Sequence, residues 1–237
     1  MAERTKDAAS DQRQDGGPSF FVSYARPPGA PSQDDASPIG DLVQDLNFEI
    51  GQHVRRESRA GPGVSDREIP LGDDWGLYIS QMLAEAHVLV ALVSAPYLDS
   101  EWCGKEWWVF SQRAVHARPP LSPKTSAILP VLWAPLPPSR GNALVQRYQY
   151  TNAGMPGAYA KEGLLALSRQ AGKRDSYHQV VNRIARRVSD LLVHTTVEPG
   201  RMVNLESAPS AFHPRHPDWS GVTFWSKQPH AAGPGQA

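Results

Sequence analysis

Short apolar runs alternate with helical repeats along the middle of the chain. The runs "SFFVSYA" (19–25), "VLVALV" (88–93) and "SAILPVLW" (126–133) predict buried β-strands, and a very short strand is expected near Val64. Pro130 cannot donate a ladder hydrogen bond, so it indicates a bulge or an edge position for the third run. A last short strand near "YQYT" is an open alternative in the proline-rich stretch that follows.

Apolar residues at spacings of three, four and seven predict the helices. A first helix is expected over 39–54, and a second begins near Asp73 or Asp74, either of which can be its N-cap, with Trp75 as a core anchor. Ser100 is the expected N-cap of a third helix, "SEWCGKEWWVFSQRAV". Shorter helices are expected around 143–147 and 163–169. The final helix has a clear apolar face, formed by Tyr177, Val180, Val181, Ile184, Val188 and Leu191.

This alternation of strands and helices predicts an α/β fold, in which a parallel central sheet carries helices on both faces. Ligands of such sheets bind outside the carboxyl ends of the strands. Loops at 23–36, 64–73 and 94–102 leave the sheet at those ends. The expected organisation is a disordered tail over 1–18, one domain over 19–194 and a mostly disordered tail over 195–237, which is rich in Pro, Ser and His.

Composition and charge exclude several classes of protein. The 237 residues contain 24 Lys and Arg and 24 Asp and Glu, so no net charge favours nucleic acid as a partner. The longest apolar runs are far shorter than the roughly 20 residues of a membrane-spanning helix. With one cysteine and no apolar leader at the start, the sequence predicts a cytoplasmic protein without internal disulfides.

The stretch "LDSEWCGKEWWVF" (98–110) carries the candidate chemistry, because it sets a glutamate among tryptophans. The expected core face of its helix consists of Cys103, Trp107, Phe110 and Ala114, and Glu101 and Lys105 form a solvated pair four residues apart. Trp102, Glu106 and Arg113 lie along an intermediate face. This spacing predicts a carboxylate at the rim of a cleft, beside an aromatic surface. The alternative is a surface glutamate that pairs with Arg113 or another cation.

Three blocks of the chain resemble the Toll/interleukin-1 receptor (TIR) domain family, most closely its bacterial members. "FFVSYA" is similar to the first strand of these domains, "VSDREIPLGDDW" to their BB loop, and "LVALVSAPYLDSEWCGKEWW" to the third strand and the helix after it. The resemblance implies a flavodoxin-like fold. It also implies two activities: self-association through the BB loop and neighbouring helices, and cleavage of NAD⁺ at the nicotinamide glycosidic bond.

The resemblance also implies roles for individual residues. The family's catalytic glutamate lies four residues beyond a tryptophan-like position, which places the role on Glu106 after Trp102. The implied substrate-binding residues are Ser23, Tyr24, Arg26, Asp66 and Trp102, and the implied interface residues of the BB loop are Ile69, Pro70, Leu71 and Gly72. After Tyr24 the chain departs from the family, because it lacks the common acidic residue and has the longer loop "RPPGAPSQDD".

Two functions remain open at this point. The first is a self-associating TIR protein that hydrolyses NAD⁺ through Glu106, with NAD⁺ as substrate and no cofactor. The second is a non-catalytic interaction or adaptor module, because one fold can serve both purposes. No metal site is expected, since His213 and His216 in "HPRHPDW" lack thiol or carboxylate partners at a known spacing.

Overall fold

The computed structural model describes residues 17–26, 38–54, 60–66, 74–137 and 154–212. Four parallel strands form its central sheet, in the order β2-β1-β3-β5. They are β1 (Phe20–Ser23), β2 (Val64–Ser65), β3 (Val88–Val93) and β5 (Ile128–Leu132). Every residue of β1 and β3 is buried, as expected for a parallel sheet covered on both faces. The predicted α/β class and parallel sheet are therefore confirmed.

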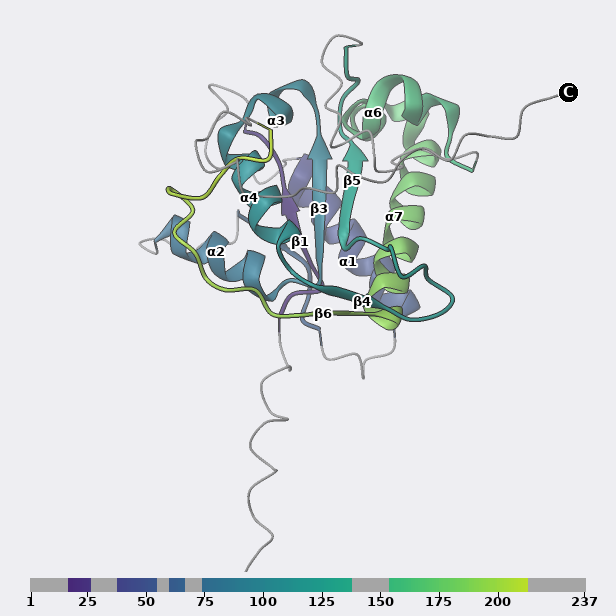
Figure 1. Ribbon diagram of the computed structural model, residues 1–237. Coiled ribbons are helices and arrows are strands. Elements are labelled where there is room, and N and C mark those ends of the chain that lie inside the picture. The colour runs from purple at the N-terminus through teal and green to yellow at the C-terminus, as the bar shows by residue number, and fades with distance from the viewer. Residues whose placement is uncertain (1–16, 27–37, 55–59, 67–73, 138–153, 213–237) are drawn as a thin grey trace, which may run out of the picture.

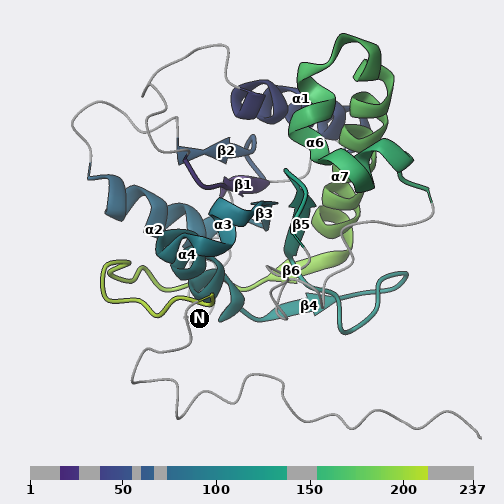
Figure 2. The same ribbon diagram turned by 90° about the horizontal axis from the view of Figure 1, so that it is seen from above.

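Helices cover the two faces of the sheet as separate layers (Figure 1, Figure 2). One layer consists of α1 (Pro38–His53), α6 (Gly157–Arg169) and α7 (Arg174–His194), with the short η3 (Ala171–Lys173) between the last two. The other consists of α2 (Trp75–Glu85), α3 (Ala95–Asp99) and α4 (Glu101–Ser111). Alternate residues of β3 point to opposite sides: Val88, Val90 and Leu92 pack in the first layer, and Leu89, Ala91 and Val93 in the second.

The helical repeats predict α1, α2 and α7 within a few residues of their observed bounds. All six residues expected on the apolar face of the last helix are buried in α7. Asp74 accepts a hydrogen bond from the Leu77 amide at 3.1 Å and Ser100 from the Cys103 amide at 3.2 Å, so both N-caps are confirmed. Among the described strands, β5 lies at the sheet edge, where the missing N–H of Pro130 is tolerated.

Three expectations about helix faces are wrong. Lys105, expected in a solvated pair with Glu101, is only 8% exposed, although the pair itself forms at 3.0 Å. Trp75 is 38% exposed and does not anchor the core. It is the first residue of α2, and its ring packs on the ring of Trp102. Ala114 is exposed because α4 ends at Ser111, three residues before it. The chain then forms β4 (Val115–Ala117), which pairs antiparallel with β6 (Thr195–Val197) in a second, two-stranded sheet. Neither β4 nor β6 is indicated by the sequence pattern.

The chain after His194 also differs from the expected disordered tail. Residues 198–212, which we call the strap, follow β6 and run along the outside of α2 and α4 (Figure 1, Figure 2). Four apolar side chains of the strap are buried in the core of that layer: Leu205, Ala208, Ala211 and Phe212. The ordered domain thus continues past residue 194, because the strap buries apolar area and bonds its backbone to the helices. Residues 138–153, with the expected helix at 143–147 and the "YQYT" strand, lie outside the described residues.

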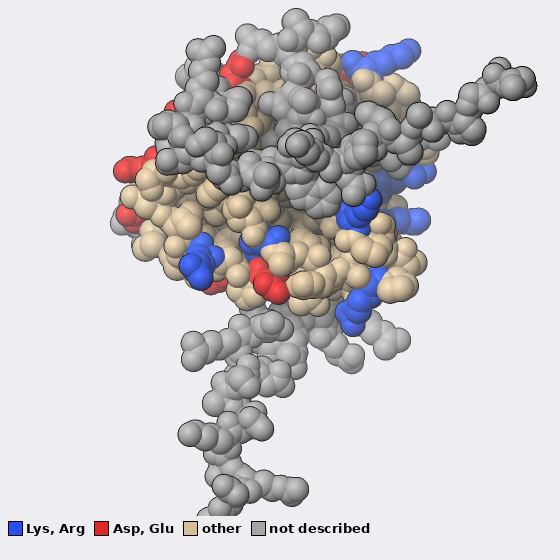
Figure 3. Space-filling model, in the orientation of Figure 1, with Lys and Arg blue, Asp and Glu red and all other residues tan. Residues whose placement is uncertain are grey.

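Charged side chains of both signs lie on the surface. On the face drawn in Figure 3, Lys and Arg are most numerous on the side of α7, and Asp and Glu lie mainly on the side of α2. No helix in the described part of the chain has the length and apolar character that crossing a membrane requires.

Candidate functional site

Glu106 lies in the middle of α4, one turn after Trp102, near the carboxyl end of β1. Its side chain is directed into the protein, and the residue is only 5% exposed. The expectation of a carboxylate at the rim of a cleft is therefore wrong. The reason is that α4 packs closely: Gly104 and Lys105 are buried as well as Cys103, Trp107 and Phe110, so the helix has little solvated surface at this turn.

Two hydroxyl groups form a hydrogen-bonded chain that ends on the Glu106 carboxyl. Ser23, the last residue of β1, donates a short hydrogen bond from its Oγ to Glu106 Oε2. Tyr97 of α3 lies 3.0 Å from the same Oγ through its own hydroxyl, and it donates there because the Ser23 proton is used on Glu106. The three residues form a buried chain from α3 through β1 to α4. Sequence reasoning missed Tyr97, for which the available signal is the Ser94 N-cap that begins α3.

Burial raises the pKa of Glu106 from 4.5 to about 8, because the charged form loses its hydration. The Ser23 hydrogen bond lowers this pKa, the negative charge of Asp66 raises it, and the indole N–H of Trp102 lowers it. Desolvation is the largest effect. At neutral pH the folded protein therefore holds this carboxyl mainly in its protonated, uncharged form.

Asp66, Arg26 and Tyr24 form a second cluster beside Glu106. Arg26 Nη2 donates to Asp66 Oδ2 at 2.7 Å, with the arginine side chain 55% exposed and the aspartate 12% exposed. Burial, together with the Asp66 carboxylate, raises the pKa of Tyr24 above its usual value of 10. Asp66 Oδ1 is buried and has no hydrogen-bond partner among the described residues. The cluster thus retains an acceptor that a ligand hydroxyl could satisfy.

The position of Asp66 depends on a close contact between α1, β1 and β2. Asn47 of α1 exchanges two hydrogen bonds with the backbone of Gly63, at 2.9 and 2.7 Å, and so fixes the start of β2. A Cβ at Gly63 would lie 2.1 Å from the ring of Phe20, so a larger residue does not fit. The pairing of β1 with β2 then brings Ser65 beside Val22. Ser23 follows Val22 and Asp66 follows Ser65, so this register also sets these two site residues near each other.

Two tryptophans lie at the start of α2 and α4 and form the aromatic part of the site. The rings of Trp75 and Trp102 stack with centroids 4.3 Å apart and an angle of 30° between their planes. Lys105 lies over the Trp102 ring, 5.8 Å from its centroid. The Trp102 indole nitrogen is buried and makes no hydrogen bond of normal geometry among the described residues, although it is close enough to Glu106 to affect its pKa.

Arg113 does not pair with Glu106, in contrast to the surface-glutamate alternative. Its Nη1 donates to the Leu83 carbonyl at 3.0 Å and to the Ala86 carbonyl, and its Nε donates to the Glu198 carbonyl at 2.9 Å. Burial lowers the pKa of Arg113 to about 10. Its guanidinium group therefore satisfies the last carbonyls of α2 and joins them to the strap.

Ile69, Pro70, Leu71 and Gly72, predicted for an interface, and His213 and His216 all lie outside the described residues. Within the described ranges, no group of three His, Cys, Asp or Glu side chains could hold a metal ion.

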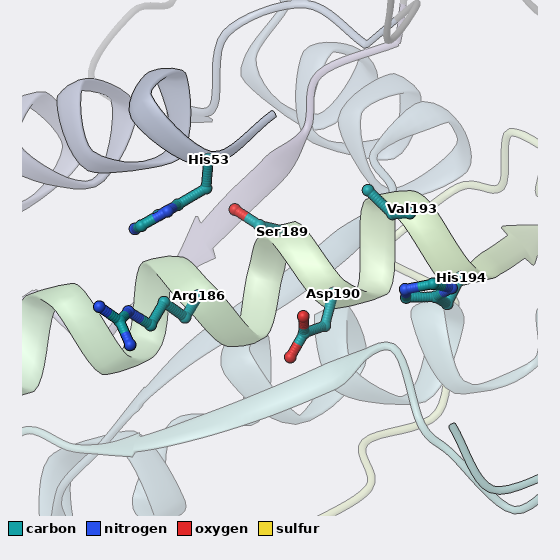
Figure 4. A pocket seen from close by; sticks show the side chains of 6 residues that line it. All are labelled: His53, Arg186, Ser189, Asp190, Val193 and His194. Atoms are coloured by element: carbon teal, nitrogen blue, oxygen red, sulfur yellow. The ribbon is translucent and has the colours of Figure 1, made fainter. Parts of the chain in front are cut away.

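A separate hollow of about 430 Å³ lies on the other helical layer, beside α1 and α7 (Figure 4). It is lined by His53, Arg186, Ser189, Asp190, Val193 and His194. None of the residues predicted for a site belongs to it. Ser189 uses its hydroxyl to bond the Ala185 carbonyl of its own helix, so the hollow offers no buried polar group aimed at a ligand.

The structure thus brings together Ser23, Tyr24, Arg26, Asp66, Trp102 and Glu106, beside the carboxyl ends of β1 and β2. Two carboxyl groups, hydroxyl groups and an indole at one place can bind a polyhydroxylated ligand and stabilise positive charge on it once Glu106 is ionised. A family model described as a TIR domain matches residues 20–164, more than half of the chain. A search of curated proteins finds no match.

Proposed function

The chain belongs to the TIR domain family, and we propose that it is a TIR signalling-type protein that self-associates and hydrolyses NAD⁺ with Glu106 as the catalytic carboxylate. The observation that carries the proposal is the position of Glu106. It lies one turn after Trp102, is held by Ser23, and faces the charge of Asp66 at the end of the sheet where ligands of this fold class bind.

The chemistry explains why such a carboxyl would be needed. Loss of nicotinamide leaves positive charge on the ribose C1 and its ring oxygen, as in the oxocarbenium-like states of glycoside hydrolysis. A carboxylate fixed beside the ribose binds that state more strongly than the neutral sugar, and so lowers the barrier. The hydroxyls of the ribose can donate to Glu106 and to Asp66 Oδ1. The C1–N bond breaks and nicotinamide leaves with its electron pair; water then forms a bond to C1 and releases a proton to solvent, so the products are nicotinamide, ADP-ribose and H⁺.

The protonated state of Glu106 sets a condition on this reaction. Only the ionised carboxylate stabilises an oxocarbenium ion, so we expect the rate of nicotinamide release to rise with pH and to reach half its maximum near pH 8. A rearrangement on self-association that hydrates Glu106 would lower its pKa and shift this midpoint toward 4.5. Rates measured from pH 5 to 9.5, for dispersed and for assembled protein, test both statements. For the dispersed protein, a rate that does not depend on pH over this range would contradict the role of Glu106.

One observation favours the adaptor alternative. A carboxyl that is 5% exposed and uncharged at neutral pH does not contact a substrate unless its surroundings move. In a non-catalytic module Glu106 would be a structural residue that joins α4 to β1 through Ser23. Interaction between proteins, which TIR domains generally mediate, would then be the whole function.

The deciding experiment incubates purified protein with NAD⁺ at high protein concentration, with and without a crowding agent, and measures nicotinamide by liquid chromatography. Light scattering reports whether assemblies have formed. We compare Glu106→Gln, which keeps the size and polarity of the side chain, with Glu101→Gln, which changes an exposed glutamate of the same helix. Hydrolysis predicts release that is lost only in the first variant. No release from demonstrably assembled wild-type protein would favour the adaptor, and substitution of Ile69 or Leu71 should then disrupt assembly.

A further inference from the structure

Three backbone amides of the strap donate hydrogen bonds to the helical layer that carries Glu106. The Gly200 amide donates to the Ala84 carbonyl at 2.8 Å, where α2 ends. The Val203 amide donates to Ser80 Oγ at 2.8 Å. The Ala211 amide donates to the Gly104 carbonyl at 2.9 Å, inside α4. The strap therefore runs from the end of α2 to α4, and in Figure 1 it passes α2 and ends beside α3 and α4.

The hydrogen bonds between the strap and α4 fall on the two residues immediately before Glu106. Besides the bond to Gly104, the Lys105 ammonium donates to the Glu206 carbonyl at 2.8 Å, and Lys105 is only 8% exposed. Gly104 has no side chain where the strap crosses: a Cβ at this position would lie 2.0 Å from Ser210 Oγ. The helix surface is thus shaped to receive the strap at the turn that bears the carboxyl.

The last described residue of the strap reaches the hydroxyl chain behind Glu106. The ring of Phe212 is buried and packs on Tyr97, with centroids 5.5 Å apart, and on Trp107, with centroids 5.7 Å apart. Tyr97 holds Ser23, which holds Glu106. The Phe212 ring therefore contacts both Tyr97, which begins the hydroxyl chain, and Trp107, the residue after Glu106.

We propose that the strap positions Glu106, and that Phe212 is a positioning residue that acts through Tyr97 and Trp107. An 11-residue helix is marginal by itself and takes its stability from packing, so the cover on α4 determines how firmly its central turn is held. Removal of Phe212 opens the space behind Tyr97 to water. Hydration of the carboxyl then lowers the pKa of Glu106 by more than a weaker Ser23 bond raises it, because desolvation is the largest effect on that pKa. The catalytic meaning of this device rests on the proposed function, whereas the positioning itself is a property of the chain.

The test measures how Glu106 titrates in the full-length protein. Protein labelled with ¹³C at the glutamate carboxyl carbons gives a titration curve for each group, and the spectrum of Glu106→Gln identifies the signal of Glu106. The other titratable groups that face it are Asp66, Tyr97 and Cys103. Burial raises the pKa of Tyr97 and Cys103, so both remain neutral over the range titrated.

Three variants of the strap separate positioning from simple cover. In Phe212→Ala we expect the midpoint of Glu106 to fall by about one pH unit or more, because water reaches the carboxyl. Phe212→Leu, which keeps the apolar bulk, should retain most of the wild-type value. Met202→Ala changes an exposed residue of the same strap and should leave the midpoint unchanged. A folded Phe212→Ala protein with the wild-type midpoint would show that the strap only covers the helix, and would overturn the proposal.

A second pair of variants decides the matter if Phe212→Ala does not fold. Gly104→Ala favours the helix but displaces the strap, so it should lower the Glu106 midpoint. Adding Ser210→Gly removes the two nearest atoms, Ser210 Oγ and Cβ, and leaves the Phe212 ring at 3.2 Å, so it should bring the midpoint most of the way back to the wild-type value. Equal midpoints in the single and the double variant would also overturn the proposal.

Nicotinamide release is measured on the same proteins. If the assembled wild type releases none while Phe212→Ala still shifts the midpoint, the proposed reaction fails and the strap proposal stands. If the wild type is active and Phe212→Ala changes neither rate nor midpoint, the strap proposal fails and the reaction stands.

Discussion

Glu106→Gln should stabilise the folded protein at high pH and leave its stability almost unchanged at low pH. The folded state raises the pKa of this carboxyl from 4.5 to about 8, so the folded protein binds a proton more tightly than the unfolded chain. Below pH 4.5 both states are protonated and ionisation has no effect on stability. Between 4.5 and 8 the unfolded chain loses its proton first, so the stability of the wild type falls as the pH rises.

The expected size of the effect follows from the two pKa values. Each pKa unit corresponds to about 1.4 kcal/mol, so ionisation of Glu106 destabilises the wild type at pH 9 by on the order of 3 to 5 kcal/mol. Glutamine cannot ionise, and its carbonyl oxygen can still accept from Ser23. The free energy of unfolding of the variant should therefore exceed that of the wild type by about 3 to 5 kcal/mol at pH 9. At pH 4.5 the two values should agree to within about 1 kcal/mol.

Urea unfolding followed by tryptophan fluorescence measures this difference. Groups that titrate alike in both proteins cancel when the variant is compared with the wild type at each pH. Glu101→Gln, on the exposed side of α4, controls for the loss of a negative charge. If the difference between Glu106→Gln and the wild type is the same at both pH values, Glu106 is not protonated in the folded state, and the account of the buried site is wrong.

Two further substitutions test the packing around the site. Ser23→Ala removes a hydrogen bond that lowers the pKa of Glu106, so NMR titration should give a higher pKa for Glu106 in this variant. Its free energy of unfolding should fall by about 1 to 3 kcal/mol. Gly63→Ala places a methyl group 2.1 Å from the Phe20 ring and should lower the thermal midpoint by several degrees or prevent folding. Gly51→Ala in α1, where an added methyl meets nothing within 4 Å, should instead stabilise by up to about 1 kcal/mol. A thermal midpoint for Gly63→Ala at or above that of Gly51→Ala would refute this reading of the contact between β1 and β2.

The elements that could be predicted are those whose signal is local. Continuous apolar runs identify strands that are buried on both faces, and the helical repeat of α7 places all of its expected apolar positions in the core. The caps at Asp74 and Ser100 follow from residue type and position alone. The cluster around Glu106 was predicted from the family pattern rather than from physical rules, and the described structure brings its residues together.

Long-range packing accounts for what the sequence did not indicate. The strap has no helical or strand period, because its burial depends on isolated apolar residues and on backbone bonds to carbonyls of α2 and α4. The depth of Glu106 could not be read from its helix position, since it depends on what the strap and α3 place around the helix. Tryptophan is a residue type common in protein cores, so its type predicts a core position for Trp75. Because Trp75 is the first residue of α2, its ring instead lies against Trp102 at the start of α4.

The burial of Glu106 has opposite effects on folding and on the proposed reaction. Closely packed surroundings hold the carboxyl in one place, which a catalyst requires, but they also keep it protonated and closed to a substrate. A fully hydrated carboxyl would be charged but less firmly placed. A TIR protein whose Glu106 ionises only when its surroundings rearrange would remain inactive as dispersed domains and become active on assembly. Under the proposed function, the raised pKa would be the physical link between self-association and hydrolysis, and under the strap proposal the strap would set how far that pKa is raised.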